Sequence, residues 1–89
     1  MGYEVDISRE AQIELDVAEC FFRAQNLHPS FLDDFFRQIA FLKTNPEAFQ
    51  IKYRDIRIIC FEQFNYSIHY IIVKHQVLIL RILGQRQDF

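Results

Sequence analysis

The sequence predicts a single α+β domain in which a helical hairpin packs on one face of a largely antiparallel four-stranded sheet. Three observations lead to this fold class. A short alternating segment opens the chain, two stretches with helical spacing of apolar residues follow it, and three strand-like segments with short connections complete it. The expected order is β-α-α-β-β-β. With 89 residues and no internal repeat or linker, residues 1–89 form one domain.

The N-terminal half contains the first strand and both helices. Residues 3–7 (YEVDI) alternate and predict a strand, and Ser8 then stands at the N-cap of a helix that runs from Arg9 to about Gln25. Residues 26–30 break this helix, and a second helix begins near Pro29 and ends at Asn45-Pro46. The apolar stripes comprise Ala11, Leu15, Ala18 and Phe22, flanked by Ile13, Val17 and Phe21, and then Phe31, Phe35, Ile39 and Leu42. Glu10, Glu14 and Glu19 are assigned to the solvated face of the first helix.

The C-terminal half predicts a β-meander. A polar link at 47–54 precedes strand-like segments at 55–62, 65–73 and 76–83, which are joined by connections of about two residues. Because a strand that leaves through a helical hairpin returns antiparallel to itself, both helices are expected on one face of the sheet.

Period-two alternation assigns each strand residue to a face of the sheet. The inward set is Tyr66, Ile68, Tyr70, Ile72, Ile56, Ile58, Cys60, Leu78, Leu80 and Ile82. The outward set is Arg57, Ile59, Phe61, Ser67, His69, Ile71, Val77, Ile79, Arg81 and Leu83. This outward set is unusually apolar for a solvated face, which indicates a surface for a partner. A register shifted by one residue, or a homodimer that covers this face, is the alternative.

Composition excludes several classes of function. A net charge of −2 gives no overall attraction to nucleic acid or to an acidic membrane. Two glycines cannot form a phosphate-binding loop, and His28, His69 and His75 show no metal-ligand spacing with the cysteines, so no cofactor is expected. Cys20 and Cys60 are interpreted as buried free thiols. Neither a signal sequence nor an apolar run of about 18 residues occurs, so a cytoplasmic protein without a membrane anchor is expected.

A group of cations and rings remains as the candidate chemistry: Lys52, Tyr53, Arg54, Arg57, His69, Arg81 and Arg86. Arginines fixed on a sheet can hold an RNA backbone and stabilise phosphoryl transfer. The same arginines can instead receive the carboxylates of a partner protein.

Several segments in order resemble the RelE/ParE superfamily of toxins from type II toxin–antitoxin (plasmid stabilisation) systems. They are ISREAQIELDVAECFF, a second helix that ends FLKTNPEAF, the entry RDIR (54–57), the strand FNYSIHY (64–70) and Arg86 after the last strand. The resemblance implies a RelE/ParE-like fold and a growth-inhibiting toxin that a cognate antitoxin covers. RelE-like members are ribosome-dependent mRNA endonucleases, whereas ParE-like members poison DNA gyrase.

The C-terminus favours the ParE-like interpretation. Gly84 stands where many relatives carry histidine, and Phe89 offers no titratable group as a general acid. Tyr66 and Tyr70 face inward and are not counted as catalytic. For antitoxin binding the sequence indicates Ile59, Phe61, Ile71, Val77, Ile79, Arg81 and Leu83. For the cellular target it indicates Arg54, Arg57, Arg81 and Arg86, and for the alternative nuclease Arg57, His69, Arg81 and Arg86.

The two last arginines are expected to serve a partner and not the fold. No acidic residue occurs in the last two predicted strands, so Arg81 is placed outward among apolar neighbours, with Arg86 on the same rim. Removing either side chain is therefore expected to leave stability nearly unchanged.

Overall fold

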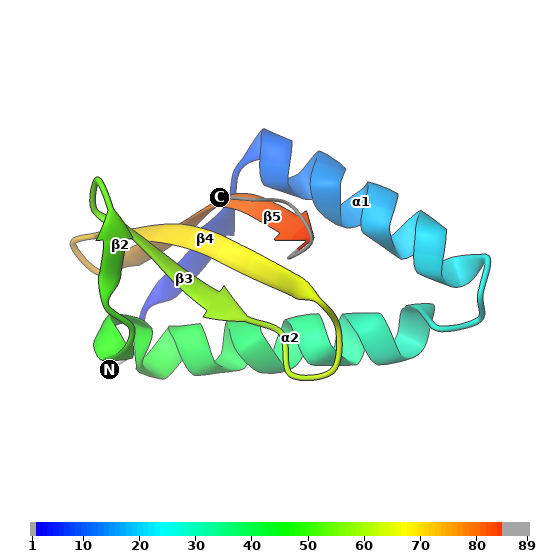
Figure 1. Cartoon of the computed structure of the whole chain (residues 1–89). Coiled ribbons are helices and arrows are strands. Elements are labelled where there is room, and N and C mark those ends of the chain that lie inside the picture. The colour runs from blue at the N-terminus through cyan, green and yellow to red at the C-terminus, as the bar shows by residue number, and fades with distance from the viewer. Residues whose placement is uncertain (1, 85–89) are drawn as a thin grey trace.

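The computed structural model describes residues 2–84 of the chain. Figure 1 shows the elements in the order β1 (Glu4–Ile7), α1 (Arg9–Arg23), α2 (His28–Thr44), a 3-10 turn (Pro46–Ala48), β2 (Ile51–Tyr53), β3 (Ile56–Cys60), β4 (Tyr66–Val73) and β5 (Gln76–Gly84). The predicted α+β fold is confirmed, with one difference. The sheet has five strands, because the segment predicted as a polar link contains the short strand β2.

The sheet has the strand order β1-β5-β4-β3-β2. β1 pairs parallel with β5, and every other neighbouring pair is antiparallel. The buried sides of α1 and α2 join one face of this sheet in a single apolar core, so both helices lie on one face as expected. None of the helices among residues 2–84 is both long and apolar enough to cross a membrane.

The start of α1 is tied to β5. The Ser8 hydroxyl oxygen accepts the backbone N–H of Ala11 at 3.1 Å, which is the N-cap that the sequence predicts. The same hydroxyl donates to the carbonyl of Leu80 at 2.9 Å, and the Ser8 N–H donates to the carbonyl of Ile79 at 2.8 Å. One residue therefore both starts the helix and fixes it to the last strand.

β2 and β3 form a hairpin with a two-residue turn. Arg54 and Asp55 both have positive φ, 47° and 68°, as a type I′ turn requires. β2 is three residues long and exposed throughout, so it carries no alternation that predicts a strand. The sequence did not indicate the turn either, because its two residues are not the asparagine and glycine that usually mark this turn type.

Four residues that alternation placed on the outward face are in the core. Ile59, Phe61, Val77 and Ile79 are 3%, 6%, 0% and 1% exposed. In β5 the cause is a bulge: His69 pairs with Arg81 but Tyr70 pairs with Ile79, so Leu80 has no partner on β4 and the alternation reverses there. In β3 the whole strand is shifted by one residue, which brings Ile59 opposite the buried Ile68.

The same shift moves Arg57 and Cys60 to unexpected places. Arg57 lies opposite Tyr70, and its guanidinium donates to the carbonyl oxygen of Phe49 in the segment after α2. Cys60 is exposed, and so is Cys20 on α1; both are free thiols. The prediction that both thiols are buried was therefore wrong, while their unpaired state is confirmed.

A buried aspartate connects α2 to the β3–β4 connection. The carboxylate of Asp34, which is 0% exposed, accepts the backbone N–H groups of Glu62 at 3.0 Å and Gln63 at 2.7 Å, and the side-chain amide of Gln38 at 3.0 Å. Burial opposes its ionisation, but these donors outweigh that effect and lower the pKa of Asp34. The charged carboxylate thus accepts backbone N–H groups of the connection, as the carbonyl groups of a neighbouring strand would in a sheet.

We expect Asp34→Asn to lower the free energy of unfolding by about 1–3 kcal/mol, because the amide NH2 would face backbone donors and leave one of them without an acceptor. Urea denaturation at neutral pH measures this loss. Asp33→Asn is the matched control, since Asp33 is the exposed neighbour on the same turn of α2 and its replacement should change stability little. Equal losses for the two variants would contradict the role given to Asp34.

Candidate functional site

A row of hydrogen-bonded polar side chains crosses the outward face of the sheet. The hydroxyl of Tyr53 on β2 lies 3.1 Å from Nδ1 of His69 on β4, and Nε2 of His69 lies 3.2 Å from Oγ of Ser67. Ser67 in turn donates to the carbonyl of Leu83 on β5 at 3.4 Å. Both ring nitrogens of His69 therefore have a hydroxyl within hydrogen-bonding distance. These hydrogen bonds link the edge strand β2 through β4 to β5.

His69 is held in its neutral form. Burial, which leaves His69 1% exposed, lowers its pKa, and the guanidinium of Arg81 directly opposite on β5 lowers it further. The carboxylate of Glu14 acts in the opposite direction but more weakly. At neutral pH the site therefore contains an uncharged imidazole, which gives the sheet face no positive charge for binding an anion.

The arginine beside this histidine already has a carboxylate partner. Nε and Nη2 of Arg81 donate to one carboxylate oxygen of Glu14 on α1, at 2.9 and 2.6 Å. The other oxygen of Glu14 accepts the backbone N–H of Ile82 at 2.9 Å. Arg81 lies on the outward face as predicted, and α1 supplies the carboxylate partner that its own strands lack. Glu14, predicted to lie on a solvated face, is that acid.

The remaining predicted site residues do not form one patch. Arg57 is engaged on the helix side of the sheet, and Arg54 is exposed in the β2–β3 turn. Ile71 and Leu83 do lie on the outward face and are half-buried. Arg86 lies outside the described residues.

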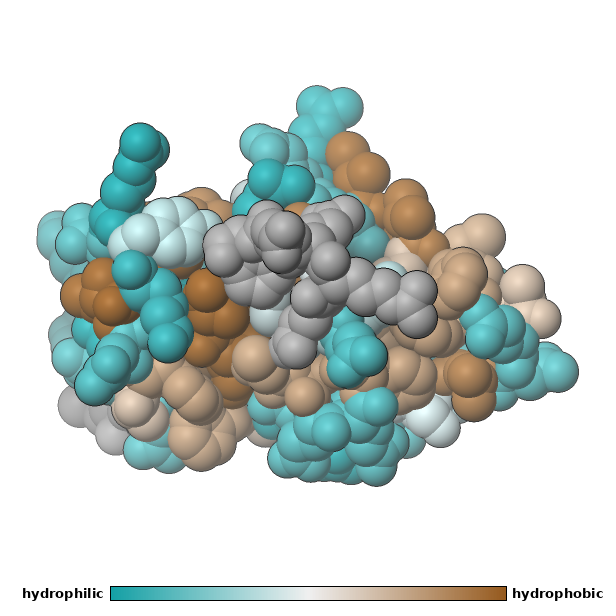
Figure 2. Space-filling model, in the orientation of Figure 1, coloured by the Kyte–Doolittle hydropathy of each residue, from teal (hydrophilic) through white to brown (hydrophobic). Residues whose placement is uncertain are grey.

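A stripe of exposed apolar side chains lies on α1 and was not predicted as a site. Ile13, Val17 and Phe21 recur every four residues and are 53%, 65% and 58% exposed. Figure 2 shows apolar side chains on the surface of this part of the molecule. In the sequence these residues form a second apolar stripe beside Ala11, Leu15 and Ala18. It was not interpreted as an exposed surface, because the first stripe alone explains how the helix packs on the core.

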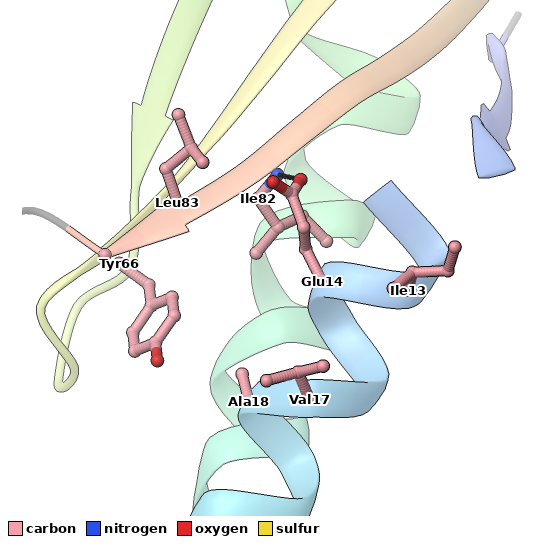
Figure 3. Close-up of a pocket in the computed structure, with 8 residues that line it drawn as sticks. Ile13, Glu14, Val17, Ala18, Tyr66, Ile82 and Leu83 are labelled. Carbon is pink, nitrogen blue, oxygen red and sulfur yellow. Dashed lines mark hydrogen bonds between the residues drawn. The ribbon is translucent and has the colours of Figure 1, made fainter. Parts of the chain in front are cut away.

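A groove runs between this stripe and the end of β5. Its volume is about 230 Å³, and it is lined by Ile13, Glu14, Val17, Ala18, Tyr66, Ile82, Leu83 and Gly84. Figure 3 shows α1 along one wall, Tyr66 on the opposite side and the hydrogen bond that the N–H of Ile82 donates to Glu14. A larger hollow of about 630 Å³ shares Tyr66 and Gly84 with it and adds Phe21, Phe22, Leu27 and Phe64.

The described residues offer little for metal or acid–base chemistry. Residues 2–84 hold no group of three or more histidine, cysteine, aspartate or glutamate side chains placed to bind a metal ion. Tyr70 is fully buried, as predicted, and donates to the carbonyl of Pro46 at 2.6 Å. Burial raises the pKa of Tyr70 to about 12, so its hydroxyl stays protonated.

These features define a small α+β protein whose exposed surface suits contact with another macromolecule. Residues 5–89 match the family described as "ParE toxin of type II toxin-antitoxin system, parDE", and the chain therefore belongs to this family. The resemblance to the RelE/ParE superfamily is thus confirmed. Membership makes the chain the toxin component of such a system, which includes an antitoxin as the toxin's partner.

A solved structure supports the fold. The chain is similar to the structure described as "Chromosomal ParDE TA system from P. aeruginosa", with a TM-score of 0.78 and 18% sequence identity over 92% of this chain and 95% of that chain. A comparison of the sequence with curated proteins finds no match.

The neutral histidine predicts a dependence of stability on pH. Above the ordinary value of 6.5, His69 is uncharged in both the folded and the unfolded chain. As the pH falls below this value, the unfolded chain takes up a proton that the folded chain resists, so the free energy of unfolding decreases until the pH reaches the lowered folded pKa. Urea denaturation between about pH 7 and about pH 5 measures the slope. His69→Gln should flatten the slope relative to wild type, whereas His75→Gln, in the exposed β4–β5 turn, should retain it.

The Arg81–Glu14 contact predicts unequal effects of removing its two partners. Glu14→Ala should lower the free energy of unfolding by about 1–3 kcal/mol, because it leaves the N–H of Ile82 without its acceptor. Arg81→Ala should cost about 1 kcal/mol or less, because the side chain is 47% exposed and solvent screens the ion pair. Thermal denaturation of both variants measures the difference, and a larger loss for Arg81→Ala would contradict it.

Proposed function

We propose that this ParE-family toxin arrests growth by binding a protein target, DNA gyrase, in the cytoplasm, and that its cognate antitoxin neutralises it by covering its surface. The proposal assigns no catalytic step to the chain. Its alternative is cleavage of mRNA on the ribosome, as in RelE-like relatives.

One observation carries the choice between them: each described side chain that a nuclease would use is already engaged by another group of the same chain. Arg57 donates to a backbone carbonyl, Arg81 is paired with Glu14, and His69 is a buried neutral imidazole. A phosphodiester gathers negative charge in its transition state, which free cations at the reacting group must stabilise. With a net charge of −2 on the chain, the sheet face supports binding to protein better than binding to RNA.

Among residues 2–84, the contact between Tyr53 and His69 favours the nuclease, since both side chains can transfer protons. The imidazole is 1% exposed, however, and both of its nitrogens have partners at 3.1 and 3.2 Å. A substrate phosphate would have to displace one of them. This arrangement supports a structural role for the pair.

Two assays on the purified toxin separate the alternatives. We expect it to inhibit DNA supercoiling by gyrase and to produce no codon-positioned mRNA cuts in a primer-extension assay with ribosomes. Adding the antitoxin encoded beside the toxin gene should restore supercoiling. Ribosome-dependent cuts that disappear in an Arg81→Ala variant, with gyrase unaffected, would overturn the proposal in favour of the nuclease.

A further inference from the structure

Two hairpin turns lie at the same end of the sheet. Because β3 and β4 are antiparallel, the start of β3 lies beside the end of β4. The β2–β3 turn (Arg54-Asp55) and the β4–β5 turn (Lys74-His75) therefore both project from this end, as Figure 1 shows at the left of the view. Residues 51–55 and 73–75 together form the turn end of the sheet.

Each of these turns begins with a long cation in a backbone conformation that such residues rarely adopt. Arg54 has a φ of 47° and Lys74 a φ of 58°. The other described residues with positive φ are Asn26 and Asp55, whose side chains tolerate this conformation. The first position of a tight hairpin turn with positive φ favours glycine or asparagine. The fold alone therefore does not favour arginine and lysine at these two positions, and unfavourable backbone of this kind is typical of functional sites.

The charges at the turn end are not used inside the fold. The ion pairs among residues 2–84 involve arginines on α1, α2 and β5, and none of them includes Lys52, Arg54 or Lys74. All three side chains are exposed. The acids nearest to them in sequence or register are Asp55, in the same turn as Arg54, and Glu4, at the β1 border of this end. Exposed cations without an ion pair contribute little to folding but can meet the carboxylates of a partner.

Apolar side chains accompany these cations. Ile51, Tyr53 and Val73 are 51%, 45% and 51% exposed. The hydroxyl of Tyr53 lies 3.1 Å from Nδ1 of the buried His69, so the tyrosine ring is held in place before a partner arrives. Figure 2 shows hydrophilic side chains projecting beside apolar ones at this end of the molecule. Fixed tyrosines and arginines among apolar neighbours are typical of the residues that dominate protein–protein interfaces.

The number of cations favours a protein over DNA as the partner. A duplex DNA site neutralises several phosphates at once and takes its affinity from that charge. The turn end offers Lys52, Arg54 and Lys74 against the nearby Asp55, on a chain with a net charge of −2. Few cations next to exposed apolar side chains match carboxylates that lie within an apolar protein surface.

We propose that the turn end binds an acidic surface of the toxin's target protein. Arg54 and Lys74 receive its carboxylates, and Tyr53 and Val73 contact its apolar side chains. The inference rests on the proposed function, because it requires a protein target, and it deepens that function by naming the surface and the chemistry of its partner. The turn end shares no lining residue with the groove beside α1.

A double variant, Arg54→Asn with Lys74→Asn, separates binding from folding. Asparagine suits positive φ, so thermal denaturation should show a Tm equal to or above that of the wild type. Binding to purified gyrase, measured by surface plasmon resonance, should weaken at least about tenfold, and should depend less on salt than wild-type binding does. The control Arg23→Gln removes a cation at the end of α1 and should change the affinity less than about twofold.

The outcomes also separate this inference from the proposed function. Wild-type affinity of the double variant for gyrase would overturn the turn end as the binding surface and leave gyrase as the target. A Tm several degrees below that of the wild type would show that the two cations serve the fold, and would overturn the inference as well. Failure of the wild-type toxin to bind gyrase would overturn both. Binding of the wild-type toxin to a labelled DNA duplex without gyrase, lost in the double variant, would assign the turn end to phosphates and overturn the acidic protein partner.

Discussion

The unpaired Leu80 in β5 is the constraint on which the rest of the site depends. Before this bulge Val77 and Ile79 face the core, and after it Ile82 does. The alternation of inward and outward residues reverses at the bulge, and the buried side of the strand stays apolar. Without the extra residue, a strand that buried Ile79 would also bury Arg81. The bulge leaves Arg81 on the opposite face, where Glu14 can reach it, and it presents the carbonyl of Leu80 to Ser8. One inserted residue thus aligns the strand, the helix start and the ion pair.

The sequence predicted the features whose signal is local. Both helices follow from a 3.6-residue period over more than 14 residues, and Ser8, Pro29 and Asn45 mark their ends by short-range stereochemistry. The strand faces failed for a physical reason. In IRIICF (56–61) and VLILRIL (77–83) apolar residues occupy both phases, so alternation cannot distinguish the buried side. A bulge adds no marker of its own, since Leu80 resembles its neighbours.

The site was harder to predict than the fold because its contacts join distant parts of the chain. Glu14 and Arg81 are 67 residues apart, and Asp34 meets the backbone of Gln63 across 29 residues. Each side chain looks like an ordinary surface charge in its own helix or strand. The role of Glu14 follows only from the parallel return of β5 beside β1, which brings the first helix against the last strand. The role of Asp34 follows only from the packing of α2 against the β3–β4 connection. The arginine was correctly placed on the outward face, but its partner belonged to an element that alternation within the sheet does not include.

The packing of α1 on the sheet explains why its second apolar stripe is left exposed to a partner. The buried stripe begins with Ala11 and ends with Ala18, with Leu15 between them, so small side chains let the helix approach the sheet closely. The core then has no space on that side for Ile13, Val17 and Phe21, which remain largely in water. Exposed area of this kind contributes nothing to folding, because it is equally hydrated in the unfolded chain. Of the described arginines on the sheet, Arg81 is paired with Glu14 and Arg57 donates to a backbone carbonyl, so the exposed stripe on α1 offers a partner mainly apolar contact.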